Sequence, residues 1–339
     1  MRYLFFKNSS TVNNPNRSQL QNNNNNNNKN IYNNSVAVTT TTATTAATPT
    51  TTTTHTAPTA KLSHALDQVV VEHLAAPGAG RESFRAHFQL LQQPGAGAWL
   101  HALPNEALGL HVAPALFRTM VRLRLRLPVA GEDVACPLCD GTADKYGDHA
   151  RVCPCGGDRV KRHNELRNLL AARAKAAGLQ PEIEKANLLP PRPELQGGVE
   201  DGSAVSGGRR PADVWVPHWN LHGPAAFDLA VTSGLRQGHL AASVADGARA
   251  TQDYEVRKCH YQDTLQTCTS EGLQFFALVV EACARGWGPT AVRTWRLLAD
   301  ALSARSSEGR AAESQRLFQS FGIVLPRENA RAVLRRLDG

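Results

Sequence analysis

Two aspartates, Asp213 and Asp228, are spaced so that they can act on one ligand. Asp213 begins one predicted strand, Asp228 lies within a second, and the sequence NLHGP at 220–224 supplies a turn between them. Alternation along the second strand places Phe227 and Leu229 on one face and Asp228 on the other. Paired strands that each carry a carboxylate can hold a divalent cation, since Mg²⁺ is usually bound by one or two protein carboxylates. An ordinary hairpin with two solvated acids is the alternative.

Four metal-binding side chains lie upstream in the spacing C-x2-C-x9-H-x3-C, and they are Cys136, Cys139, His149 and Cys153. Zinc prefers four such ligands in a tetrahedron, and this short spacing is typical of a structural site. Cys155 competes with Cys153 for the fourth position. Because four protein ligands close the coordination shell, we predict structural Zn²⁺ here and no catalysis. Buried thiols beside an incidental histidine are the alternative.

The order of these motifs resembles the C-terminal region of a non-LTR retrotransposon polyprotein. In that family a CCHC zinc knuckle is followed by a restriction-like endonuclease of the PD-(D/E)XK superfamily. Here the cysteine–histidine motif is followed by Arg162-His163-Asn164 and then by the two aspartates, and the resemblance extends from about Ala96 to Glu281. The reverse transcriptase of the family has no counterpart in this chain, because the sequence contains no aromatic-x-Asp-Asp box.

The resemblance implies that Asp213 and Asp228 bind Mg²⁺ or Mn²⁺ and that Lys258 completes the catalytic site. The lysine of the superfamily normally stands two residues after the second acid, where this chain has Ala230. Lys258 instead shares one face of a helix predicted over 239–269 with three large side chains, Tyr254, Tyr261 and Leu265. A lysine that buries its stem and keeps its ammonium group in solvent is the alternative.

Three further residues are candidates for the same site, Glu184, His163 and Glu281. Glu184 lies in a predicted strand, and a solvated glutamate is the alternative for it. His163 lies on a predicted basic helix, where it would contact a phosphate or the water on the metal. A histidine packed into the protein is the alternative for it. Glu281 either faces the site or ends its strand.

Basic residues form two strips that we predict to contact the nucleic-acid backbone, and they are Arg118, Arg122, Arg124, Arg126, Lys161 and Arg162. The predicted partner is DNA, with RNA as a second candidate. A solvated helix face is the alternative for each arginine. The net charge is +8, but residues 1–60 contain four basic residues and no acid, so half of that charge lies outside the predicted folded part. Charge alone is therefore weak support for nucleic-acid binding.

The fold class that we predict is α+β, with a restriction-endonuclease-like core in which a small mixed sheet is flanked by helices. The sheet is predicted from 181–189, 211–217, 226–232 and 273–283, and the flanking helices from 158–177 and 239–269. The predicted divisions are a disordered Asn/Thr-rich tail (1–60), a helical linker region that resembles the segment after the polymerase (61–135), the zinc knuckle (136–157), the endonuclease domain (158–305) and a C-terminal helical extension (306–339).

The function expected from the resemblance is metal-dependent phosphodiester hydrolysis that nicks a DNA target. A catalytically inactive, zinc-dependent nucleic-acid-binding protein derived from the same kind of element is the alternative. The sequence has no secretory signal and no apolar stretch long enough to span a membrane, and the seven cysteines indicate a reducing compartment. An intracellular location follows from these features, and the resemblance specifies the nucleus.

Overall fold

The computed structural model describes residues 56–76, 81–191, 209–220 and 223–337. Two compact units make up the chain, one of Ser9–Val69 and one of Met1–Asn8 with Val70–Gly339. Helix α1 (Thr56–Ala75) begins in the first unit. Of the predicted disordered tail (1–60), residues 1–55 lie outside the described residues. Residues 56–60 belong to the start of α1.

A four-stranded mixed sheet organises the larger unit. Its order is β3 (Glu182–Ile183), β4 (Val214–Val216), β5 (Ala225–Thr232) and β6 (Gln274–Glu281). The first three strands are antiparallel neighbours, whereas β5 and β6 run parallel. A parallel pair needs a crossover connection, and helices supply it here. This arrangement confirms the mixed α+β class.

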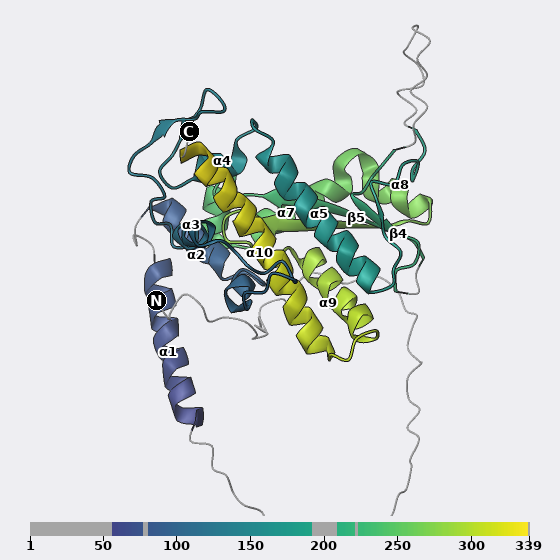
Figure 1. The fold of residues 1–339 in the computed structure, drawn as a ribbon, viewed down its shortest axis with the longest axis horizontal. Helices are drawn as coiled ribbons and strands as arrows, with labels where there is room; N and C mark the ends of the chain where they lie inside the picture. Colours follow the sequence, from purple (N-terminus) through teal and green to yellow (C-terminus); the bar gives the residue numbers. More distant parts are fainter. Residues whose placement is uncertain (1–55, 77–80, 192–208, 221–222, 338–339) are drawn as a thin grey trace, which may run out of the picture. The chain divides into compact units, whose positions relative to one another are not determined.

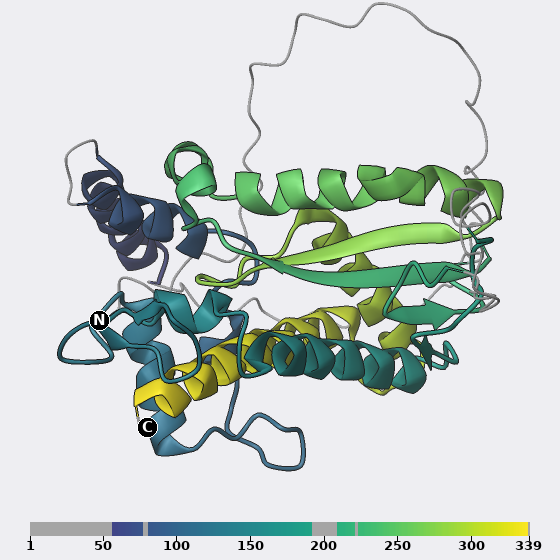
Figure 2. The same ribbon diagram turned by 90° about the horizontal axis from the view of Figure 1, so that it is seen from above.

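Each face of the sheet is covered by helices, as Figure 2 shows. Phe227 and Leu229 of β5 face a core formed with α5 (Asp158–Ala176), α9 (Pro289–Ser303) and α10 (Arg310–Leu337). Ala226 and Ala277 face the opposite side, where α7 (Arg249–His260) and α8 (Thr264–Ser270) pack. The alternation predicted for β5 is therefore correct, and it directs Asp228 toward α7.

The strand predicted over 181–189 is much shorter in the structure. Regular pairing ends at Ile183, and only an isolated bridge between Leu189 and Arg209 follows. Glu184 and Asn187 have φ angles of 51° and 59°, a left-handed conformation that a strand does not accommodate. The predicted strand is wrong beyond Ile183 for this reason.

The single helix predicted over 239–269 is also wrong. The structure divides it into α6 (Gln237–Ala245), α7, a 3₁₀ turn (η4, Tyr261–Asp263) and α8. Gln262 and Asp263 have positive φ angles, which end the helical path. Tyr261 is consequently 62% exposed and Leu265 is exposed too, so the predicted inward face does not continue past α7.

The remaining elements lie in order along the chain (Figure 1). They are α2 (Glu82–Leu91), the 3₁₀ helix η2 (Ala98–His101), α3 (Pro114–Arg124), the strand pair β1 (Val134–Ala135) and β2 (Thr142–Ala143), and α4 (Asp148–Val152).

Helix α10 packs against α3, α5, α9 and η2. Its middle section around Phe321 is fully buried, so residues 310–337 contribute to the core of the larger unit. Among the described helices, none is both long and apolar enough to cross a membrane.

Candidate functional site

A pocket of about 230 Å³ opens beside the start of β4 and the middle of β5. Asp213, Asp228 and Lys258 all line it, as does the segment from Arg209 to Ala212. Val214 pairs with Phe227, so the antiparallel register places Asp213 opposite Asp228 at the next position. The structure therefore brings together the two predicted acids and the predicted lysine, each from a different element.

Asp213 is held at both carboxylate oxygens. Its Oδ2 accepts a hydrogen bond from the backbone N–H of Leu229 at 2.7 Å, and its Oδ1 lies 3.0 Å from Nε2 of His163. This hydrogen bond raises the pKa of His163 above its ordinary value, against the lowering effect of burial. The predicted histidine on α5 thus contacts a candidate site acid rather than packing among apolar side chains.

Asp228 and Lys258 form an ion pair, with 2.7 Å between Oδ2 and Nζ. Burial raises the pKa of Asp228 to about 6, although the adjacent ammonium group opposes that rise. Burial alone would lower the pKa of Lys258, but the negative charge of Asp228 outweighs it and raises that pKa. The pair is therefore charged near neutral pH. Of the two partners, Asp228 has the pKa that lies closer to neutral pH.

Glu184 does not line the pocket with the two aspartates. Its carboxylate forms ion pairs with Arg167 and, at 2.8 Å, with Arg210. Since β3 ends before Glu184, the side chain points to these arginines, and its predicted role as a further metal ligand has no support in the geometry.

Glu281 is also placed away from the pocket. It lies four residues beyond Ala277, the partner of Asp228 in the parallel register, which is roughly 13 Å along the strand. Its buried carboxylate accepts hydrogen bonds from the N–H groups of Gly234, Cys283 and Ala284 at 3.0, 2.7 and 2.5 Å. Glu281 therefore organises the loop after β6, and its predicted place in the site is wrong.

The Cys₃His site exists as predicted. The ligand atoms of Cys136, Cys139, His149 and Cys153 all lie within 4.8 Å of one another, which is a geometry that could hold a zinc ion. Cys155 is not part of this cluster, which settles the alternative for the fourth position. In the part of the chain that the structure describes, no other group of three or more such side chains is placed to share a metal.

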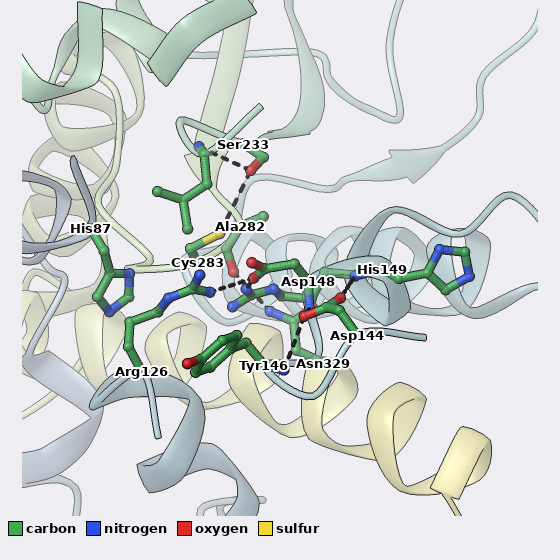
Figure 3. A network of polar contacts seen from close by, with 12 residues as sticks. His87, Arg126, Asp144, Tyr146, Asp148, His149, Ser233, Ala282, Cys283 and Asn329 are labelled. Atoms are coloured by element: carbon green, nitrogen blue, oxygen red, sulfur yellow. Dashed lines mark hydrogen bonds and ion pairs between the residues drawn. The ribbon is translucent and has the colours of Figure 1, made fainter. Parts of the chain in front are cut away.

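Asp144 positions the histidine end of the Cys₃His cluster, and sequence reasoning did not identify it. Its carboxylate accepts hydrogen bonds from the backbone N–H groups of Tyr146, Asp148 and His149 (Figure 3). Gly147 in this turn has a φ of 72°, which is favourable for glycine. The pattern D-x-x-G before the histidine was the available signal.

The six predicted nucleic-acid-binding residues divide into two groups. Arg118, Arg122 and Lys161 are exposed, whereas the other three are buried, and these are Arg124, Arg126 and Arg162. The prediction that the buried three contact nucleic acid is wrong, because they bind other parts of the protein.

Internal partners account for this burial. Arg124 donates to the carbonyl of Ala96 at 2.7 Å, and Arg126 forms an ion pair with Asp148 at 2.5 Å. Arg162 donates to the side chain of Asn329 at 2.7 Å.

Arg209 and Arg210 line the pocket and were not predicted to be site residues. They directly precede Pro211, so their position next to the first acid was a signal that the sequence offered.

No family model matches this chain, and a search of curated proteins finds no match either.

Proposed function

We propose that this chain is a metal-dependent DNA endonuclease with a restriction-endonuclease-like core, related to the C-terminal region of non-LTR retrotransposon polyproteins. The observation that carries the proposal is the convergence of Asp213, Asp228 and Lys258 on one pocket. A mixed sheet between two layers of helices supports the proposed core.

The donor set of the pocket suits a hard divalent cation. Two carboxylates face the same space, and carboxylate oxygens are the ligands that Mg²⁺ and Mn²⁺ prefer. The pKa of about 6 for Asp228 reflects burial of a negative charge, which a bound cation would stabilise. When bound, such an ion would lower the pKa of a water molecule and stabilise charge on the scissile phosphate.

The side chains of the site have separate tasks in this proposal. His163 and the N–H of Leu229 fix the orientation of Asp213. Lys258 keeps Asp228 ionised and offers its remaining N–H groups to a phosphate oxygen. Arg209 and Arg210 add positive charge at the rim, where a DNA backbone would approach.

The proposed reaction is hydrolysis of one phosphodiester bond. A water oxygen forms a bond to phosphorus, the bond between phosphorus and the leaving ester oxygen breaks, and that oxygen takes up a proton. The products are a free hydroxyl end and a phosphate end, so a circular duplex would be nicked.

A plasmid-nicking assay on the full chain tests this function, with Mg²⁺ or Mn²⁺ added and zinc content measured in parallel. Asp228→Asn and Asp213→Asn should each abolish metal-dependent nicking. The matched control is Glu182→Gln, since Glu182 is an exposed acid outside the pocket that forms an ion pair with the nearby Lys185.

The alternative function is nucleic-acid binding without catalysis. The observation that favours it is that Asp213 and Asp228 already have protein partners, and that Ala230 replaces the usual lysine. Folded, zinc-loaded wild type that binds DNA but does not nick it would establish this alternative and refute the endonuclease.

A further inference from the structure

Five arginines are buried where α3, α4, α5 and the loop after β6 meet. Their exposed fractions are between 1% and 7%, and they are Arg124, Arg126, Arg151, Arg162 and Arg285. Arg126 and Arg151 both pair with Asp148, and Arg162 donates to the carbonyl of Arg151 at 3.1 Å. Arg124 and Arg151 also lie near enough to Arg285 for their charges to lower its pKa, so the five guanidinium groups share one region. None of the five lines the aspartate pocket.

Negative charge in this region does not match the positive charge. Among the described residues, the carboxylates of Asp148, Glu281 and Asp158 act on these arginines. Glu281 already accepts three backbone hydrogen bonds, and Asp158 already pairs with Arg331 and Arg336. His87 adds no charge, because burial lowers its pKa to about 3. Buried charges are normally paired, since leaving one unpaired strongly disfavours the folded state. The region thus has an excess of buried positive charge that calls for a counterion.

Arg285 is the least satisfied of the five. It is 1% exposed, and none of its three guanidinium nitrogens has a hydrogen-bond partner among the described residues. The contact that it does make is with the ring of Trp99, whose centroid lies 5.1 Å from the guanidinium carbon. Nε of Arg124, Nε of Arg126 and Nη1 of Arg151 are likewise buried without a hydrogen-bond acceptor among those residues. Donors from several elements are therefore available in one enclosed region.

The backbone forces Arg285 into this position. Its φ of 71° is unusual for a residue with a side chain, and such strain persists only where the surroundings impose it. The carbonyl of Glu281 accepts the N–H of Arg285 at 3.0 Å, and the carboxylate of Glu281 holds Cys283 and Ala284. Asn329 of α10 donates to the carbonyl of Ala282 at 2.8 Å (Figure 3). The loop is thus fixed so that Arg285 points inward instead of into solvent.

We propose that these guanidinium groups bind an oxoanion of the phosphate type inside the protein, with Arg285 as its principal ligand. A guanidinium group presents paired N–H donors that match two oxygens of one oxoanion. The N–H donors come from α3, α4 and the loop after β6, so they can contact an ion whose oxygens point in several directions. Because Arg285 is almost fully buried, the ion is enclosed and contributes to folding. It is separate from the proposed nuclease chemistry.

The wild-type protein tests this proposal without any variant. The full chain is purified without phosphate or sulfate, unfolded in guanidinium chloride, and the released anions are measured by ion chromatography. We expect about one phosphate or sulfate per chain if the ion is retained. If it exchanges, phosphate at about a hundred times its Kd should raise Tm by about 5–10 °C relative to chloride at equal ionic strength.

Two variants sharpen the result. Arg285→Met should remove both the released anion and the effect of phosphate on Tm, whereas Arg118→Met, at an exposed arginine, should change neither. If Arg285→Met does not fold, the wild-type measurements decide alone. Absence of any released oxoanion together with equal Tm values in phosphate and chloride would overturn the proposal, as would retention of the phosphate effect in Arg285→Met.

Discussion

Replacing Asp228 by asparagine should change stability with a defined dependence on pH. Folding raises the pKa of this carboxyl from 3.8 to about 6, mainly through burial. The folded state therefore binds the proton more tightly than the unfolded state. Stability from this group is fully present below pH 3.8 and is lost as pH rises through 6. The total loss is about 3 kcal/mol, at 1.36 kcal/mol for each pKa unit.

Asp228→Asn has no proton to lose, so its stability should not show this decline. Of the total, about 1.4 kcal/mol falls between pH 5.0 and pH 7.5. The free energy of unfolding of Asp228→Asn minus that of wild type should therefore rise by about 1.4 kcal/mol across this interval. Urea unfolding of both proteins at several pH values measures it, and contributions from titrating groups that do not interact with Asp228 cancel in the difference.

A difference that stays constant between pH 5.0 and pH 7.5 would refute the reasoning, because Asp228 would then titrate in its ordinary range. Glu182→Gln is the control, since this exposed carboxyl lies outside the pocket and does not contact Asp228. The same samples should lose metal-dependent nicking in Asp228→Asn alone, which connects the buried charge to the proposed activity.

Four other predictions about substitutions follow from the geometry. Lys258→Met removes the ammonium group 2.7 Å from Asp228, so the pKa of Asp228 should rise further and half-maximal nicking should move to higher pH; an unchanged pH profile would contradict this role. His163→Ala should destabilise the protein more at pH 6 than at pH 9 in urea unfolding. The bond to Asp213 raises the pKa of His163, so its stabilisation is present below the ordinary pKa and lost as pH rises through the folded value. Cys153→Ser should lower bound zinc in a metal analysis, whereas Cys155→Ser should retain it; an equal decrease in both would count against the assigned ligand set. Arg118→Ala combined with Lys161→Ala should make the plot of log affinity for DNA against log salt shallower, by about 1 in slope for each phosphate that the protein no longer neutralises. An unchanged slope would remove these exposed residues from the interface.

The sequence by itself determined the features that depend on neighbours within a few residues. The cysteine–histidine spacing identified the members of the Cys₃His cluster except for the choice between Cys153 and Cys155. The two-residue period of β5 placed Phe227 in the core and Asp228 on the other face. These predictions succeeded because a strand or a short metal-binding turn has a fixed geometry that residue spacing reflects directly.

Tertiary structure decided everything that depends on which distant segments pack together. The spacing of the arginines after Ala113 predicts one basic surface. In the structure, however, Arg124 is buried and donates a hydrogen bond to the carbonyl of Ala96, while Arg118 is exposed. The left-handed residues Gln262 and Asp263 ended a helix that the apolar period alone would continue. The local sequence pattern does not predict the burial of an arginine or the end of a helix at a strained residue. Burial and backbone strain are set by contacts between elements far apart in the chain.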